Sequence, residues 1–332
     1  DKLHNYYLTN PYWYIENDSL LDNFSIRKLD YSNIDLVEQI SSDILFLMRE
    51  YDMDGFSITH HSNMDELNSK FNKFKSNNGI EFLKIIEPNQ LTARPNSKSS
   101  KSNSYYDIDL YKAARDHFSG FNPDFVKLNG LIQKSLDKYG PVNLMINTTS
   151  TQKDERFITL ADYNDFLNSD LTPSAMSYKK LSMFMTMNYS LPGIPLIFYG
   201  EEFGHQGDVG VDSKRDMKFH RALNDLEKKL KARVSILNRI RNKYSSLSIG
   251  DFLVLREGAD YSVWLKSYFD EQTLILFNTS NEEKLINILL PRHTTKLISL
   301  FDKKDIELSG SNRLKINIPA HTSRIYLLDT IN

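Results

Sequence analysis

The stretch "LPGIPLIFYGEEFGHQGDVGVDSKRDM", residues 191–217, decides the fold that the sequence predicts. It opens with Pro and Gly and continues as an apolar run over residues 194–199, which is typical of a buried strand. Glycines at Gly204, Gly207 and Gly210 then space out a long turn. The Gly-Lys-Ser ending of a phosphate loop is absent, so we interpret the stretch as a strand and its loop and not as a nucleotide site.

Upstream of this stretch, helix-like and strand-like segments alternate. Apolar residues recur every three to four positions in the helical segments, whereas the strand segments are short and nearly continuously apolar. Such alternation is typical of a parallel α/β sheet. The predicted strands are 53–58, 80–86, 105–111, 142–147 and 194–199, and the predicted helices are 33–51, 64–77, 124–139, 173–189 and 219–244.

Beyond residue 245 the pattern changes to short alternating runs separated by Gly, Asn, Pro and Asp. Regularly spaced runs of this kind predict a small antiparallel β-sandwich. We therefore place a domain boundary near Ser245.

Composition excludes several functions. The formal charge is −2, with acidic and basic residues interspersed, so the chain has no strong field for nucleic acid. The absence of cysteine rules out disulfides and thiolate chemistry. No apolar run approaches the roughly 20 residues of a membrane span, and no targeting segment is visible. The chain begins at Asp1, so processing upstream stays open, and the sequence leaves the compartment unknown.

The motifs resemble the α-amylase superfamily, glycoside hydrolase family 13, in the style of neopullulanases and cyclomaltodextrinases. Residues 191–217 are similar to its eighth strand and following loop, and "HTSRIYLLD" is similar to the last strand of its C-terminal domain. "MDGF", "FLKIIE" and "NLMINTTSTQKDERFIT" resemble its fourth, fifth and seventh strands. The resemblance implies an α/β fold, a domain derived from a (β/α)8 TIM barrel followed by an antiparallel sandwich.

Barrel strands one to three have no counterpart in this sequence. Residues 1–32 resemble the end of the segment that the family inserts after its third strand, residues 33–245 a partial barrel, and residues 246–332 the sandwich. A barrel avoids exposed sheet edges only by closing, so the visible strands need a complement. We expect an upstream segment of the same product, a partner chain or a rearranged sheet.

Retaining hydrolysis in this family implies a carboxylate nucleophile, a general acid and a second Asp. The family's fourth strand reads Gly-Phe-Arg-x-Asp, and here Ser57 and Thr59 replace the Arg and the nucleophile. A threonine hydroxyl with no adjacent base is a poor nucleophile. Glu87 alone falls at a matching position, that of the general acid.

The second Asp, which follows a His after the seventh strand, is also missing. Counting back from Arg156 puts Gln152 and Lys153 at the His-Asp pair, whereas a register anchored on "NLM" puts Thr148 and Thr149 there. An inward Lys153 about 4 Å from an oxocarbenium-like centre would oppose it by about 4 kcal/mol. Substitution by Asp154 or Glu155 would require a rebuilt loop.

Other residues are candidates for binding. Tyr12, Trp13 and Arg156 could contact a sugar, although packing is the competing interpretation for the aromatic rings. His60 and His61 have no second cluster at metal spacing, so we predict no metal ligand and no cofactor. Glu201 and Glu202 resemble a family turn whose role is structural.

We therefore predict a catalytically degenerate family homologue that acts as a non-enzymatic scaffold, assembly or glucan-binding protein. Its expected partners are an α-glucan or a polypeptide that completes the barrel, with no nucleic acid. The alternative is an active α-glucan hydrolase or transglycosylase, completed by a missing segment or partner chain.

Overall fold

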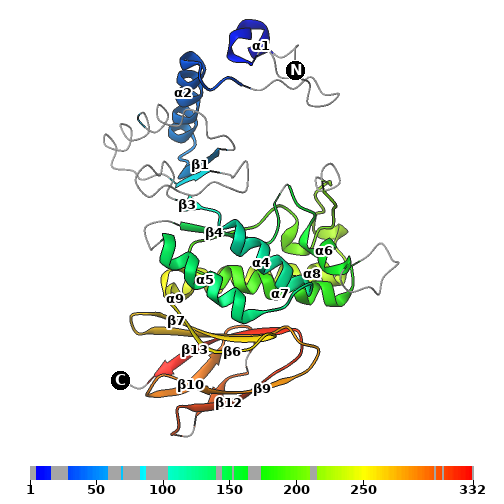
Figure 1. Cartoon of the computed structure of the whole chain (residues 1–332), viewed down its shortest axis with the longest axis vertical. Coiled ribbons are helices and arrows are strands. Elements are labelled where there is room, and N and C mark those ends of the chain that lie inside the picture. Colours follow the sequence, from blue (N-terminus) through cyan, green and yellow to red (C-terminus); the bar gives the residue numbers. More distant parts are fainter. Residues whose placement is uncertain are drawn as a thin grey trace. The chain divides into compact units, whose positions relative to one another are not determined.

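The computed structural model describes residues 5–15, 29–58, 69, 83–86, 104–139, 144–151, 153–163, 173–209, 215–302, 304–308 and 310–330 (Figure 1). By the density of its contacts the chain divides into two compact units, Asp1–Tyr105 and Tyr106–Asn332. This division does not test the predicted bounds 1–32, 33–245 and 246–332, which stay a prediction.

The first unit contains one long helix and a parallel strand pair. Asn33 caps the helix by accepting a hydrogen bond from the Leu36 amide, as expected of an Asn at a helix N-terminus. The predicted helix 33–51 and the strand within 53–58 are confirmed; strand 80–86 is confirmed for its described part, and helix 64–77 lies outside the described residues except residue 69. The elements are α1 (Asn5–Thr9), η1 (Pro11–Trp13), α2 (Ile34–Glu50), β1 (Gly55–Ile58), β2 (Leu83–Ile86) and β3 (Ser104–Tyr105), with β1 and β2 parallel.

The second unit begins with helices and two further parallel strands. The helices predicted at 124–139 and 173–189 are confirmed, and that at 219–244 forms from Asp225. The elements are α4 (Ile108–Ser119), α5 (Phe125–Tyr139), β4 (Leu144–Thr148), α6 (Phe157–Tyr163), α7 (Ala175–Ser190), β5 (Ile194–Leu196), η2 (Glu201–Phe203), η4 (His220–Ala222), α8 (Asp225–Lys243) and α9 (Ser245–Ile249).

The strand predicted at 105–111 is wrong beyond Tyr105, because α4 begins at Ile108. Asp107 caps that helix by accepting from the Leu110 amide. Leu110, Ala114 and Phe118 are buried at the four-residue spacing of one helix face. The strand predicted at 194–199 is also shorter than expected, because the chain turns at Gly200, whose φ of 82° is left-handed.

Helix α7 is the centre of the second unit. It is buried almost all round, and it contacts β4 as well as strand β13 (Thr322–Thr330) of the antiparallel sheet (Figure 1). Arg241 of α8 closes its carboxyl end, donating from Nη1 to the carbonyls of Tyr189 (2.7 Å) and Leu191 (2.9 Å) and from Nη2 to that of Gly193 (2.6 Å). A single buried cation therefore satisfies one carbonyl in the last turn of the helix and two in the connection that follows it.

The C-terminal strands form two antiparallel sheets that share one apolar core. Leu276 and Leu297 of the larger sheet meet Ile288 and Ile316 of the smaller one in that core. Alternate burial along β9 and β12 shows that one face is covered and one is exposed. The strands are β6 (Asp251–Glu257), β7 (Tyr261–Tyr268), β8 (Glu271–Asn278), β9 (Lys284–Leu289), β10 (Thr294–Ser299), β11 (Ile306–Glu307), β12 (Arg313–Ile318) and β13, in the orders β11-β10-β13-β8-β7-β6 and β12-β9.

Gly193 tests how closely the α7–β5 connection packs on β4. Its φ of 103° is left-handed, and a Cβ there would overlap the backbone carbonyl oxygen of Met145. We expect Gly193→Ala to lower the free energy of unfolding by about 2 kcal/mol or more, because neither the backbone conformation nor the space allows a side chain. The measurement is urea denaturation followed by circular dichroism.

Gly130→Ala is the matched control. Gly130 lies within α5, and a Cβ there would meet nothing within 4 Å. Alanine should stabilise this helix by about 0.5–1 kcal/mol. Equal effects of the two substitutions would contradict the packing described at Gly193.

Lys266 of β7 places an amine inside the second unit. The residue is fully buried, and its Nζ donates to the Gly250 carbonyl oxygen at 2.5 Å. Burial, with a smaller contribution from the neighbouring Arg241, lowers the pKa of Lys266 from 10.5 to about 7. The unfolded chain therefore binds more protons than the folded one between about pH 7 and 10.5.

Lys266→Met should change how stability depends on pH. Because the unfolded state holds the extra proton in that window, this lysine makes the free energy of unfolding rise with pH, by at most about 1.4 kcal/mol per unit. The free energy of unfolding of the wild type, relative to that of Lys266→Met, should thus increase from pH 7 to pH 10. Exposed Lys315→Met is the control, and parallel pH profiles for all three proteins would contradict a depressed pKa.

Candidate functional site

The candidate site lies where β4 and β5 end. The two strands are parallel, with Ile146 opposite Ile194 and Thr148 opposite Leu196, so their carboxyl ends meet at one edge. Thr148 ends β4, and Thr149 and Ser150 follow it directly. All three are buried. Three residues with hydroxyl side chains therefore lie at the carboxyl end of this strand pair.

Glu201 is the partner of these hydroxyls. It is the first residue of η2, and it is fully buried. Thr149 Oγ1 donates to its Oε2 at 2.6 Å, and Ser150 Oγ donates to its Oε1 at 2.7 Å. Arg156 Nη1 lies 4.0 Å from Oε1. Each carboxylate oxygen thus has a hydroxyl donor, and a buried cation offsets the negative charge.

Arg156 is held entirely by the protein. Its side chain is fully buried, its Nη1 donates to the Tyr199 carbonyl at 2.7 Å, and its own amide donates to the Gly207 carbonyl at 2.8 Å. The guanidinium carbon lies 4.0 Å from the centroid of the Phe198 ring and 4.5 Å from that of Tyr199. These contacts with two adjoining rings, whose centroids lie 5.1 Å apart, fix the loop after β5 against the loop after β4.

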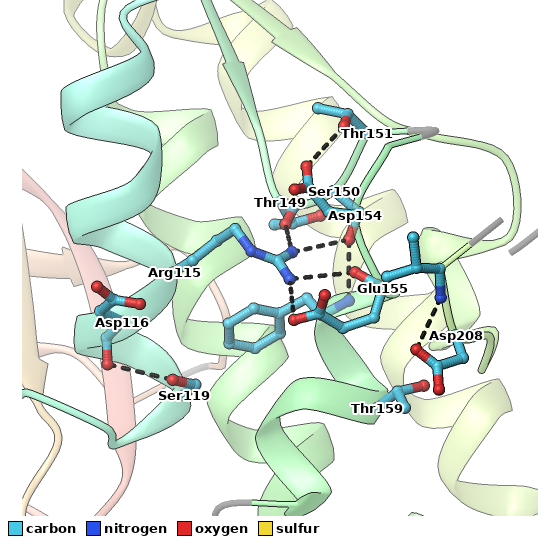
Figure 2. Close-up of polar contacts among 12 residues, drawn as sticks. Arg115, Asp116, Ser119, Thr149, Ser150, Thr151, Asp154, Glu155, Thr159 and Asp208 are labelled. Carbon is cyan, nitrogen blue, oxygen red and sulfur yellow. Dashed lines mark hydrogen bonds and ion pairs between the residues drawn. The ribbon is translucent and has the colours of Figure 1, made fainter. Parts of the chain in front are cut away.

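Arg115 extends from α4 into the same network (Figure 2). Its Nη1 donates to the Thr149 carbonyl at 2.8 Å, and its Nη2 pairs with the Glu155 carboxylate at 3.0 Å. One guanidinium therefore holds both the backbone at the end of β4 and the loop that follows.

Asp154 completes the loop. Its Oδ2 accepts from the Tyr111 hydroxyl at 2.8 Å and from Thr151 Oγ1 at 2.6 Å. Burial raises the pKa of Tyr111, so its hydroxyl stays protonated and acts as a donor. The carboxylates of Asp154, Glu155 and Glu201 are thus each bound to protein donors.

This arrangement suits holding a loop better than cleaving a bond. A carboxylate beside two hydroxyls could in principle activate one of them, but Glu201, Thr149 and Ser150 are all fully buried. A substrate atom must reach within about 3 Å of a reacting group, which these positions do not permit.

The remaining predicted catalytic positions are placed as follows. Ser57 lies in β1 opposite Ile85 and is exposed. Lys153 is exposed in a turn and does not point inward; its amide donates to Thr151 Oγ1 at 3.2 Å. Thr59, Glu87, Gln152, His60 and His61 lie outside the described residues. Thr148 ends β4 and Thr149 follows it, and neither register for the His-Asp pair is tested, so both stay predictions.

Tyr12 and Trp13 differ in exposure. Tyr12 is 55% exposed, and its hydroxyl donates to Asn10 Oδ1 at 3.2 Å. Trp13 is buried, with its ring 6.2 Å from that of Tyr6. Tyr12 is therefore accessible to a ligand, while Trp13 and Arg156 pack inside the protein.

Arg115 and Tyr111 were missed from the sequence. Both lie on α4, in a segment that we interpreted partly as a strand. The signal that could have found them is Asp107 followed by apolar residues at helical spacing, which marks a capped helix. Even then, their partners 34 to 43 residues away in sequence could not have been inferred.

Two further searches cover the described residues. Among them, no group of three or more His, Cys, Asp or Glu side chains could hold a metal ion. No helix in the described ranges is long and apolar enough to span a bilayer.

No protein-family model matches the chain. A cyclomaltodextrinase of Thermoanaerobacter pseudethanolicus is 22% identical over 255 residues, covering 73% of this chain and 40% of that protein. An amylopullulanase of Thermoanaerobacter thermohydrosulfuricus is 26% identical over 213 residues, covering 59% of this chain and 14% of that protein. The chain therefore spans less than half the length of these curated relatives.

Solved structures agree in fold. An Anoxybacillus α-amylase superposes with a TM-score of 0.78 at 20% identity, over 98% of this chain and 73% of that one. The chain is thus a relative of the α-amylase family, glycoside hydrolase family 13. A Geobacillus thermoleovorans α-amylase, solved with acarbose, superposes with a TM-score of 0.80 at 19% identity, over 99% of this chain and 75% of that one. These α-amylase neighbours are TIM-barrel proteins with a sheet-rich C-terminal region.

Thr149→Val tests the buried carboxylate of this α-amylase relative. The substitution keeps the shape of the side chain but removes the donor to Glu201 Oε2. We expect a loss of about 1–3 kcal/mol in the free energy of unfolding, because a buried charged acceptor is left unsatisfied. Thr295→Val, which removes an exposed hydroxyl bond to the Asp329 carbonyl, should cost much less. Equal losses in urea denaturation would show that Glu201 does not depend on Thr149.

Proposed function

We propose that this chain is a catalytically degenerate α-amylase relative that binds α-glucan without cleaving it. The observation that carries the proposal is at the end of β4, where Thr149 donates to buried Glu201 in place of an acidic side chain that faces a substrate. Retaining hydrolysis requires two carboxyl groups about 5–5.5 Å apart that face the substrate.

The magnitude of the deficit favours inactivity over slow turnover. Loss of one member of a cooperating catalytic set typically costs about 10⁴ to 10⁶ in rate. Here Thr59 stands at the position of the nucleophile and Ser57 at that of the supporting Arg. The second Asp is absent in either register of the seventh strand. Neighbouring Asp154 and Glu155 are engaged by Tyr111 and Arg115, so neither is available as a substitute.

A finer fold assignment is part of the proposal. We assign β1, β2, β4 and β5 to barrel strands four, five, seven and eight, and the two C-terminal sheets to the family's sandwich. Parallel strands need cover on both faces, and β1 and β2 pair as two strands in the described part of the chain. Helix α2 also exposes Ile34 (61%) and Phe46 (58%), and its C-cap residue Tyr51 is 70% exposed. We propose that further polypeptide, of the same product or of a partner, covers these elements.

The glucan assignment rests on the relatives and on one accessible ring. The relatives are named cyclomaltodextrinase and amylopullulanase, and a structural neighbour was solved with acarbose. Tyr12 presents an exposed aromatic face, the kind of surface that stacks on sugar rings.

The test is calorimetric titration of the full chain with maltoheptaose, alongside an assay for sugar release from maltoheptaose and a cyclodextrin. We expect saturable heat and no release. Tyr12→Ala should weaken binding by about tenfold, the effect of losing roughly 1.4 kcal/mol of stacking. Tyr163→Ala, at a tyrosine 62% exposed, should leave binding unchanged.

Two results would contradict the proposal. Sugar release that disappears in Glu87→Gln would show an active hydrolase or transglycosylase, whose other carboxylate comes from residues outside those described or from another chain. If the titration shows no heat and the assay shows no sugar release, the glucan assignment is wrong. A scaffold or assembly role then remains.

A further inference from the structure

Strand β12 lies at the edge of the smaller antiparallel sheet (Figure 1). In the described part of the chain it pairs only with β9, over the residues Arg313–Ile318. An edge strand leaves half of its backbone amides and carbonyls without a partner in the sheet. The register of the pair shows which backbone groups these are.

The outward backbone groups of β12 belong to Arg313, Lys315 and Asn317. Just beyond the two strands, the Leu290 amide donates to the Asn312 carbonyl at 2.8 Å. Opposed residues of an antiparallel pair alternate between hydrogen-bonded and non-hydrogen-bonded pairs. Every second residue counted from Asn312 therefore directs its amide and carbonyl toward β9, and the residues between them direct theirs away.

A contact from the larger sheet supports this alternation. Arg256 Nε of β6 donates to the Asn287 carbonyl at 3.1 Å, and Asn287 lies opposite Lys315. The Asn287 carbonyl thus points away from β12, as the alternation requires for this pair. The outward edge of β9 therefore faces β6, whereas no strand among the described residues pairs with the outward edge of β12.

The side chains of the outward-pointing residues of β12 are exposed. Burial alternates along the strand, with Leu314, Ile316 and Ile318 in the core and the residues between them exposed. Neither cation of β12 forms an ion pair with another described residue. The exposed face of the strand pair has two cations and no carboxylate, and it consists of Leu285, Asn287, Leu289, Arg313, Lys315 and Asn317.

These features define the side chains of a strand that could be added to β12. Its outward residues would lie across from Arg313 and Lys315, where acidic side chains are attracted and basic ones are repelled. Its inward residues would continue the layer of Leu314 and Ile316, where apolar side chains fit. Pairing with β12 of a second copy is opposed, because it would bring like charges together.

We propose that the free edge of β12 binds an extended segment of a partner protein in which acidic and apolar residues alternate. Because the Arg313 amide already donates to Ser311 Oγ at 3.2 Å, the amides of Lys315 and Asn317 are the donors that the edge offers. Backbone hydrogen bonds supply the affinity in this mode of recognition, and the two cations select the charge of the segment. The proposal goes beyond glucan binding and does not depend on it.

The first test titrates the full chain with three synthetic peptides by calorimetry. The acidic probe is acetyl-Thr-Glu-Val-Glu-Val-Glu-Val-Thr-amide. The second peptide has Lys in place of each Glu, and the third keeps the acidic side chains but carries N-methyl groups on its internal amides. We expect saturable binding of the acidic probe alone. No binding of that probe, or equal binding of the N-methylated peptide, would overturn strand addition.

Variants locate the site. Lys315→Glu should weaken binding of the acidic probe by about tenfold, because a pair of opposite charges becomes a pair of like charges. Lys231→Glu, the same change at an exposed residue of α8, is the matched control. Asn317→Pro removes an outward amide and keeps both cations and the bonds to β9, so it should also weaken binding.

Circular dichroism checks that each variant is folded, and if Asn317→Pro is not, Lys315→Glu alone decides. Unchanged affinity in the folded variants would overturn the assignment to β12.

Two further measurements separate this proposal from other interpretations. Sedimentation that shows self-association of the chain, lost in Lys315→Glu or Asn317→Pro, would place a second copy at the edge and overturn the acidic segment. In the wild type, binding of the acidic probe without binding of maltoheptaose would reject only the glucan proposal. Binding of maltoheptaose without the acidic probe would reject only strand addition.

Discussion

The carboxylate of Glu201 is the constraint on which this part of the structure depends. A fully buried charge is stable only when its oxygens are hydrogen-bonded and a cation lies near. Thr149 and Ser150 supply the hydroxyls and Arg156 supplies the cation, so the end of β4 is fixed to the turn after β5. Arg115 then joins α4 to the same backbone through the Thr149 carbonyl. The segments after β4 and β5 thus meet at one charge, and α4 is joined to them through the backbone.

In the catalytically degenerate protein that we propose, this network would hold the fold together at a strand end that no longer carries out chemistry. In a β/α barrel the strand ends carry the reacting groups, while the packing beneath them carries stability. Here the packing is intact: α7 is buried almost all round between β4 and the antiparallel sheet, and Arg241 satisfies the carbonyls at its end. At the strand end, in contrast, the polar side chains bind one another. Their hydrogen bonds are satisfied within the protein and leave no carboxylate of this network open to a sugar.

Sequence patterns predicted the long elements well where one periodicity dominated. The helices at 33–51, 124–139 and 173–189 and the strand at 142–147 agree with α2, α5, α7 and β4 to within about two residues. The strand at 105–111 failed because the segment is short, and only the cap at Asp107 separates strand from helix there. At the site, the sequence analysis singled out Thr149 and Glu201, but it interpreted Glu201 only as part of a turn with a structural role. It did not suggest that the two side chains meet.

By itself the sequence predicted, through its resemblance to the family, that the acidic residues of the fourth and seventh strands are replaced. Its alternation of segments also determined the strand and helix order of most of the chain. Only the tertiary structure decided which groups satisfy one another, because Glu201 lies 52 and 51 residues from Thr149 and Ser150 along the chain. A buried charge selects its partners by proximity in space, and local sequence patterns carry no information about that proximity.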